Sequence, residues 1–228
     1  MKTFKIMMMA CGLAFALSAT ANAQMGGMMR QGPQPRGLFN PIVGSGAQYE
    51  IQSTNGKSMA MEIDVVGKES VGGVDAYWFE TVMANPQMGG NIVMKVLTVP
   101  AGGNATVTKM IMQMGNRPPM EMPSQMTQMA QGGQKQTPTD IRGEAEDVGS
   151  ESVTTPAGTF TCEHYRMKDG SGDSWISDKV SPYGLIKHQG KDSTMVLTKI
   201  VTDAKDKITG TPVPFNPMMM GMGGPPQQ

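Results

Sequence analysis

Cys162 and His164 are the residues whose types and spacing come nearest to a catalytic pair. Side chains two residues apart on a strand share a face, so a strand here would carry both on one face, together with Phe160. A thiolate beside an imidazole can form a nucleophile pair or half of a metal site. No third ligand lies nearby in the sequence, and a lone cysteine on a strand is usually a small buried apolar residue. We therefore expect a structural role for Cys162, and a hydrolase that uses this pair is kept as an alternative.

Methionine offers a second kind of chemistry, because 25 of the 228 residues are methionine. Thioethers are soft ligands that select Cu(I), and Met-x-Met or Met-x-x-Met spacings let a flexible chain bring several sulfurs to one ion. Methionine is also an adaptable apolar residue at binding surfaces. Candidate Cu(I) ligands are Met218, Met219, Met220 and Met222, and further clusters lie at Met25, Met28 and Met29 and at Met110, Met112, Met114, Met120, Met122, Met126 and Met129.

Carboxylates gather at residues 144–147 and again between Asp169 and Asp173. Neither segment has the spacing of a calcium-binding loop, and aspartate is common in turns for backbone reasons alone. Acid–base catalysis would require burial or a neighbouring like charge to separate two pKa values, and the sequence indicates neither. The sequence also lacks a glycine-rich phosphate loop, a Gly-x-Ser-x-Gly elbow and a His-Glu-x-x-His motif. We therefore expect solvated carboxylates and predict no catalytic residue, metal or cofactor.

The charge balance and the N-terminus indicate the compartment. The 19 basic residues equal the 19 acidic ones and do not form the basic patch that nucleic-acid binding requires. Lys2 and Lys5 precede an apolar stretch from Ile6 to Leu17, and Ala21-Asn22-Ala23 is a small-x-small cleavage site, as in a signal peptide. We predict cleavage after Ala23 and a periplasmic or secreted protein. No segment offers the run of about 20 apolar residues that a transmembrane anchor requires. Acylation at Cys11 is the alternative maturation.

Three segments lack the periodicity of strands or helices and are dominated by Gly, Pro, Gln and Met: residues 24–46, 116–139 and 203–228. Such compositions bury too little apolar surface to offset the entropy of ordering the chain. We expect the flanks 24–46 and 203–228 to be flexible and to add little stability, and residues 116–139 to form a long loop. The remaining sequence predicts one β domain over residues 47–202.

Within that domain the hydrophobic period is two. Met59, Met61, Ile63 and Val65 alternate with polar or small residues, as in a strand with one buried face. Turns containing Gly or Pro separate further strands, and the lack of helices between them favours an antiparallel sheet over an α/β fold. The predicted strands are 59–65, 74–82, 91–99, 105–113, 149–155, 159–168, 172–177, 185–189 and 193–202.

A short helix is predicted inside the long loop, from Ser124 to Gln131. Gly132 and Gly133 would end this helix, and Met126 and Met129 would share one of its faces. Such a helix would cross the sheet as a lid. Because isolated helices of this length are marginal, a disordered loop is the alternative.

The C-terminal half carries motifs that resemble several exported bacterial families of unknown function. The motifs are Pro156-Ala-Gly-Thr-Phe-Thr-Cys162, then Trp175-Ile-Ser177, then Gly184-Leu-Ile-Lys187, against a family pattern of P-A-G-T-F-x-C, W-x-S and G-L-V/I-K. These families are similar in fold to the periplasmic lipoprotein carriers of the LolA/LolB-like group. The resemblance implies a half-barrel, in which a strongly curved antiparallel sheet surrounds an apolar concave face closed by helices. It is best over residues 149–202 and weaker over 47–113.

We accordingly expect a mainly β, exported protein that binds an apolar or acylated ligand, without catalysis, on the concave face of one curved antiparallel sheet. An apolar concave face of this kind can serve as the floor of a ligand site. A Met-rich protein that handles Cu(I) or scavenges oxidants is the alternative. The ligand-cavity candidates are Met59, Met61, Ile63, Trp78, Met126, Met129, Phe160 and Trp175.

Overall fold

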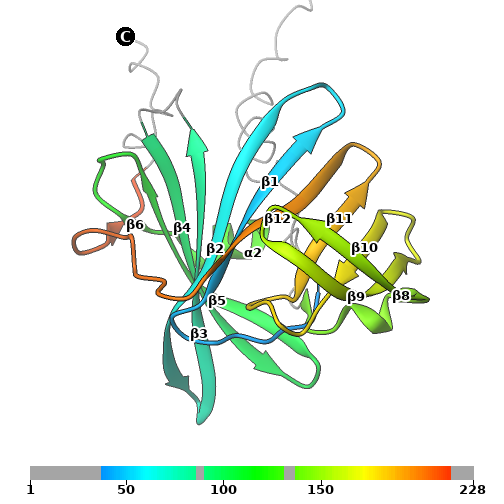
Figure 1. Cartoon of the computed structure of the whole chain (residues 1–228). Helices are drawn as coiled ribbons and strands as arrows, with labels where there is room; N and C mark the ends of the chain where they lie inside the picture. The colour runs from blue at the N-terminus through cyan, green and yellow to red at the C-terminus, as the bar shows by residue number, and fades with distance from the viewer. Residues whose placement is uncertain (1–36, 86–89, 131–136, 217–228) are drawn as a thin grey trace, which may run out of the picture. The chain divides into compact units, whose positions relative to one another are not determined.

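Alternating apolar and polar side chains produce long strands in the computed structural model, which describes residues 37–85, 90–130 and 137–216 (Figure 1). The strands are β1 (Gly46–Ser53), β2 (Ser58–Val71), β3 (Val74–Asn85), β4 (Gly90–Ala101), β5 (Asn104–Met114), β6 (Met120–Glu121), β7 (Thr137–Pro138), β8 (Ala145–Thr155), β9 (Gly158–Met167), β10 (Gly172–Ile176), β11 (Leu185–Gly190), β12 (Ser193–Val201) and β13 (Val213–Pro214). The helices in these residues are α2 (Ser124–Ala130) and the 3-10 helix η2 (Ile141–Gly143).

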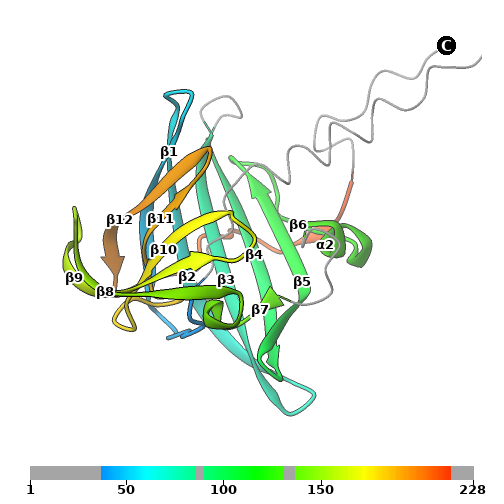
Figure 2. The same cartoon turned by 90° about the vertical axis from the view of Figure 1, so that its right-hand side faces the viewer.

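The strands form one open, curved sheet in the order β13-β6-β5-β4-β3-β2-β1-β12-β11-β10-β9-β8, and β7 is attached to β5. The expectation of a mainly β fold with a single curved sheet is confirmed. The sheet was expected to be antiparallel and is mixed, because β13 pairs in parallel with β6 while the other pairs of strands are antiparallel. A long connection leads from β12 to β13 at the β6 edge of the sheet. Unlike a tight hairpin, such a connection does not impose antiparallel pairing. Figure 2 shows β8–β10 curling in front of β2 and β3.

The predicted strands coincide with β2–β5 and β8–β12, although β2 continues to Val71 and β8 begins at Ala145. Gly72 and Gly73 both adopt positive φ, 59° and 83°, and so form the two-residue turn between β2 and β3. β1 was not predicted, although Ala47, Tyr49 and Ile51 alternate with Gln48, Glu50 and Gln52. The two-residue strands β6, β7 and β13 are too short to show any period.

Both flanks contain residues that pack against the sheet. The ring of Phe39 lies 5.6 Å from that of Phe79 and 6.4 Å from that of Tyr183, measured between centroids. Residues 203–216 follow β12 and end just beyond β13. The expectation of flexible flanks therefore does not hold for residues 37–46 and 203–216, where aromatic and charged side chains supply contacts that composition does not reveal. The predicted signal peptide and residues 24–36 and 217–228 lie outside the described residues.

The long loop predicted at residues 116–139 contains β6, α2 and β7. The predicted helix is confirmed as α2, which begins with hydrogen bonds from the amides of Met126 and Thr127 to the carbonyl of Pro123. α2 packs against β5, close to the β6 edge of the sheet (Figure 2). Met126 is half-buried there, and the side chain of Met129 lies outside the described residues. Closure of a ligand site by α2 stays a prediction.

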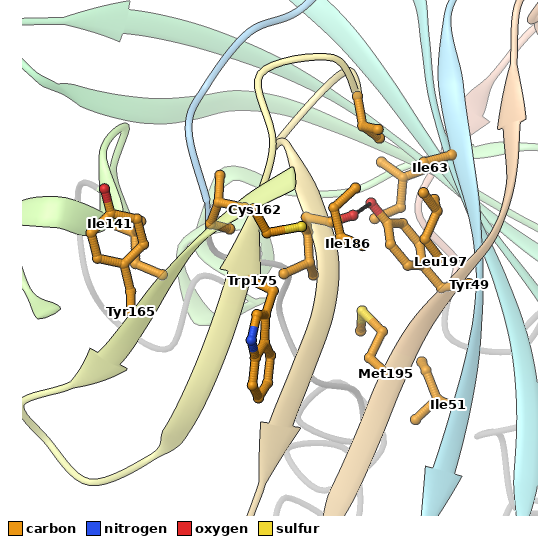
Figure 3. Packing of buried hydrophobic residues seen from close by; sticks show 14 of the residues in the cluster. Tyr49, Ile51, Ile63, Ile141, Cys162, Tyr165, Trp175, Ile186, Met195 and Leu197 are labelled. Carbon is orange, nitrogen blue, oxygen red and sulfur yellow. Dashed lines mark hydrogen bonds between the residues drawn. The ribbon is translucent and has the colours of Figure 1, made fainter. Parts of the chain in front are cut away.

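The main hydrophobic cluster joins β1 and β2 to β9–β12. Figure 3 shows Cys162 and Tyr49 directed toward Ile186 from opposite sides, with Leu197 beside Tyr49. The Tyr49 hydroxyl donates to the carbonyl of Leu185 at 3.1 Å, which satisfies the one polar group of this buried ring. Burial of a large apolar side chain contributes about 1.5–3 kcal/mol, so the cluster holds the curled β8–β12 half of the sheet against β1 and β2.

Candidate ligand-binding face

Cross-strand register gathers methionines on one face of β2–β6. Met94 lies opposite Met112, and Met112 lies opposite Met120, so three neighbouring strands place thioethers in one row. In the adjacent row Met61 lies opposite Met83. Side chains of direct cross-strand partners start about 4.5–5.5 Å apart and point to the same face. We call this surface the methionine face; it comprises Met59, Met61, Met83, Met94, Met110, Met112, Met114 and Met120.

The methionine face has a buried part and an accessible part. Its members on β5 and β6 are buried, and so is Met61. Met59, Met83 and Met94 are half-buried and keep part of their side chains accessible. Unbranched thioether side chains adapt to the shape of a neighbour more easily than branched ones. The face can therefore make apolar contact with a ligand while its buried part belongs to the core.

The structure brings some of the predicted cavity residues together and separates others. Met59, Met61 and Ile63 lie on the inner face of β2, as their alternation indicated, with Met61 and Ile63 in the main hydrophobic cluster and Met59 against it. Phe160 and Trp175 contact the same cluster from β9 and β10. Trp78 and Met126 lie elsewhere in the fold, and whether any of these residues contacts a ligand stays a prediction.

Trp78 points to the opposite face of β3 from Met83. Its indole N–H donates to Glu69 at 3.2 Å, and the ammonium of Lys95 lies 5.1 Å from the ring centroid. Successive side chains of a strand point to opposite faces of the sheet. Phe79 and Met83 share one face of β3, so Trp78 lies on the other. It therefore does not share a surface with Met59.

Met83 and Met94 belong to the methionine face but were not among the predicted cavity residues. Their strands were predicted, and both residues follow the same period of two as Thr81 and Ile92. The missing information is the register, because alternation within one strand does not say which residue of the next strand lies opposite. The turn between β2 and β3 would not have supplied the register of Met83, because the irregularity between Val65 and Gly67 shifts the pairing by one residue.

Cys162 and His164 do share Glu151 as a neighbour, but their chemistry is separate. Cys162 is 1% exposed, and burial, followed by the charge of Glu151, raises the pKa of its thiol to about 11. The two ring nitrogens of His164 lie 3.1 Å from a Glu151 oxygen and 3.0 Å from an Asp173 oxygen. The imidazole is thus oriented by carboxylates rather than by the thiol. A protonated thiol is a poor nucleophile, so this arrangement does not activate Cys162.

Trp175 is the centre of a polar cluster on the same strands. The ring of His164 stacks on it at 4.4 Å between centroids, and the Lys187 ammonium lies 4.5 Å from its centroid. Its indole N–H donates to Glu151. These contacts use the ring face and the N–H group, so they account for the burial of Trp175 without a ligand.

A cavity of about 390 Å³ lies between the segment before β1, η2 and β8–β10. Its apolar residues are Leu38, Cys162 and Ile176, and polar residues, all exposed except the buried Ser177, form the rest of its wall. The Arg142 guanidinium in that wall is held by Asp140 at 2.6 Å. The cavity is therefore a second place for a small ligand, separate from the methionine face. Its polar lining residues are Arg142, Ser150, Thr161, Glu163, Ser177 and Asp178.

Within 37–85, 90–130 and 137–216, no group of three or more His, Cys, Asp or Glu side chains is arranged to hold a metal ion. The candidate Cu(I) ligands Met218, Met219, Met220 and Met222 lie outside the described residues. In the part of the chain that is described, no helix combines the length and the apolar character needed to cross a membrane.

Comparison with known proteins yields similarity in solved structures alone. No protein-family model and no curated protein matches the chain. A Bacteroides fragilis protein whose name describes it as exported, with a YmcC-like fold, aligns at 14% identity and a TM-score of 0.40, over 73% of this chain and 99% of its own. A Parabacteroides distasonis protein whose name describes it as a lipoprotein aligns at 15% identity and a TM-score of 0.35, over 73% of this chain and 100% of its own.

Proposed function

We propose that this protein is an exported, non-catalytic binder of an apolar or acylated ligand, and that the methionine face is its binding surface. The observation that carries the proposal is the in-register set of methionines in which Met59, Met83 and Met94 remain half-buried. The predicted signal peptide supports export. The motifs that resemble families similar to the LolA/LolB-like carriers support an acylated ligand.

The expected affinity follows from the size of the ligand. Each buried methylene contributes about 0.8 kcal/mol, so eight methylenes would contribute about 6 kcal/mol. Association costs at least about 4 kcal/mol in lost translational and rotational freedom. The net affinity is therefore weak, well short of nanomolar, and rises with the length of the acyl chain.

Thermal unfolding in the presence of saturated fatty acids of increasing length tests the proposal, because a ligand that binds the folded state raises the unfolding midpoint. We expect a gain that grows with chain length, together with displacement of a fluorescent acyl probe. Met83→Asp and Met94→Asp should each weaken probe binding, because they place a charge on the methionine face. Val148→Asp is the matched control, since Val148 is an apolar residue on β8 that is 46% exposed.

Two outcomes would contradict this assignment. A thermal unfolding midpoint that does not change with fatty acids of any chain length would show that the protein binds no acyl ligand. This measurement needs no variant. Loss of binding in Leu38→Asp but not in Met94→Asp would move the site to the cavity between η2 and β8–β10.

The row of Met94, Met112 and Met120 also favours the alternative function, Cu(I) handling. These three thioethers come from adjacent strands and are direct neighbours in register. Soft sulfur ligands without a hard donor select Cu(I) over Zn(II). The two proposed functions, acyl-ligand binding and Cu(I) binding, use the same face. The substitution Met112→Leu distinguishes them, because it removes a sulfur ligand and keeps an apolar side chain.

A further inference from the structure

Residues 203–216, which we call the strap, connect β12 to β13 and cross the outer face of β2–β5, opposite the methionine face (Figure 1). The Ala204 amide donates to the carbonyl of Gly44 at 2.9 Å. The Thr209 amide donates to the side chain of Gln113 at 3.0 Å, and the Val213 amide to the carbonyl of Pro119 at 2.9 Å. The strap is therefore fixed at its start, its middle and its end.

Charged groups fill the space between the strap and the sheet. The Lys207 ammonium lies 2.8 Å from Glu62 and also contacts Asp64, both on β2. Its backbone amide donates to both carboxylate oxygens of Glu80 on β3, at 3.0 and 3.1 Å. Asp206 pairs with Lys95 on β4. Four carboxyl groups thus meet two ammonium groups.

Two of these carboxyl groups have no access to solvent. Asp64 and Glu80 are both 0% exposed. One oxygen of Asp64 has no hydrogen-bond partner among the described residues, and it packs against Gly46, where an added Cβ would lie 1.9 Å away. A buried carboxylate with an unpartnered oxygen is costly in its ionised form, and that cost falls when the group is protonated.

The neighbouring charges define which groups hold a proton. Burial, then the hydrogen bond with Glu62, raises the pKa of Asp64 to about 6. Burial, then the hydrogen bond with Asp206, raises the pKa of Glu80 to about 7. Burial opposes the ionisation of Glu62 and Asp206 too, but hydrogen bonds from their partners outweigh it and lower both pKa values. As the pH falls, Asp64 is therefore protonated before Glu62, and Glu80 is protonated before Asp206.

The other groups near these carboxyl groups are two uncharged side chains, the strap lysine itself, an exposed ion pair and the exposed Lys199 of β12, which lies opposite Gln48 in register. β1 contributes the uncharged Gln48, which donates to Glu62 at 2.7 Å, and β5 contributes the uncharged Gln113. Burial opposes the charge of Lys207, but Asp64 and Glu62 outweigh it and raise the pKa of its ammonium. Lys205 and Asp203 form a pair that is 75% and 81% exposed, at the solvent side of the strap.

We propose that the strap is a clasp that mild acid tightens: protonation of Asp64 and Glu80 strengthens the docking of residues 203–216 on β2–β5, and rising pH weakens it. The sign follows from burial and linkage: the strap covers Glu80 and contacts Asp64, so its release would return these carboxyl groups to water, where their charged forms are favoured. The contacts of Lys207 with the charged forms oppose this effect but do not outweigh it, because both pKa values stay raised. Above about pH 7 the four carboxylates outnumber the two ammonium groups. At strongly acidic pH the protonation of Glu62 and Asp206 reverses the trend.

The clasp controls one edge of the sheet. β13 at the end of the strap pairs with β6, and β6 carries Met120 opposite Met112. Release of the strap would therefore free β6 of its outer neighbour. The clasp does not depend on whether the methionine face binds a ligand.

Amide hydrogen exchange of the full chain, corrected for intrinsic exchange rates, tests the clasp. Between about pH 8 and about pH 5.5 we expect the protection of the Lys207, Thr209 and Val213 amides to rise about tenfold or more. Amides in the centre of β9 should show no comparable rise. A wild-type protection that is unchanged or lower at the acidic pH would overturn the proposal, and this measurement needs no variant.

Variants then assign the effect to its groups. Asp64→Asn and Glu80→Gln should each reduce the pH dependence of strap protection. Asp203→Asn is the matched control, because it removes a carboxylate from the same strap at an exposed position. A pH dependence that survives in both buried variants, or that disappears in Asp203→Asn, would also overturn the proposal.

Discussion

Lys207 binds Glu80 with its backbone as well as its charge. One amide N–H is shared by both carboxylate oxygens, and the ammonium lies 3.9 Å from the nearer one. A glutamine at position 80 would keep an oxygen for the amide and remove the buried charge. The substitution Glu80→Gln can therefore separate the contribution of the backbone hydrogen bond from that of the charge.

Glu80→Gln is expected to stabilise the protein at pH 8 by about 1–3 kcal/mol. Burial raises the pKa of Glu80 to about 7, so its favourable contribution is complete at acidic pH and is lost as the pH rises through that value. The advantage of the variant should vanish below about pH 5. Urea unfolding at several pH values measures it. A variant that is less stable than wild type at pH 8 would show that the charge itself holds Lys207.

Truncations should separate the strap from the residues that follow it. Deleting residues 203–228 removes Lys207 and all hydrogen bonds and ion pairs of the strap, which contribute about 1 kcal/mol each, so the thermal midpoint should fall by several degrees. Deleting residues 217–228 leaves all of these contacts in place, and the thermal midpoint should stay within a few degrees. Equal midpoints for the two truncations would contradict the role of the strap.

The thiol of Cys162 should resist alkylation in the folded protein. Burial raises its pKa to about 11, so the thiolate fraction at pH 8 is roughly 100-fold lower than for an unperturbed thiol. In a chain without residues 1–23, Cys162 is the only thiol. Mass spectrometry after iodoacetamide treatment should show slow modification without denaturant and fast modification in urea. Fast modification of the folded chain would revive the pairing with His164.

Met112→Leu tests Cu(I) binding without removing the apolar surface. Leucine has a similar volume, so the loss of stability should stay below about 1.5 kcal/mol and acyl-probe binding should persist. Competition with a chromogenic Cu(I) chelator should show weaker retention in this variant if the row binds copper. Replacing Met218, Met219, Met220 and Met222 by Leu tests the C-terminal cluster in the same assay. Unchanged Cu(I) retention in both variants would exclude both groups of thioethers as Cu(I) ligands.

Maturation is expected to produce an N-terminus at Gln24. The basic start, the apolar stretch and Ala21-Asn22-Ala23 fit cleavage after Ala23. The intact mass of the protein recovered from the extracytoplasmic fraction measures the cleavage site. A mass that corresponds to an acylated Cys11 at the new terminus would identify a lipid-anchored protein instead.

Sequence periodicity located Met59, Met61 and Ile63 on one face because alternation is a local property of a strand. It could not place Met83 or Met94 beside them, because register depends on turns and on irregularities such as the shift between Val65 and Gly67. Cys162 was correctly expected to be buried.

The strap was missed for a different reason. Lys207 lies 127, 143 and 145 positions along the chain from Glu80, Asp64 and Glu62. Its surroundings, rich in Lys, Asp, Thr and Pro, have no hydrophobic period. A charged contact of this range leaves no pattern within any window of the sequence, and composition therefore indicated a flexible tail.

The position of Lys207 near the end of the chain also sets an order of assembly. Synthesis proceeds from the N-terminus, so β2 and β3 are complete long before residues 206 and 207 exist. Until then the outer face of the incomplete sheet presents Glu62, Asp64 and Glu80, and no lysine from the strap neutralises them. Water must solvate these carboxylates, and full closure of that face has to wait for the last part of the chain. A nascent chain arrested before residue 207 would accordingly be held in an unfinished state by its own charge.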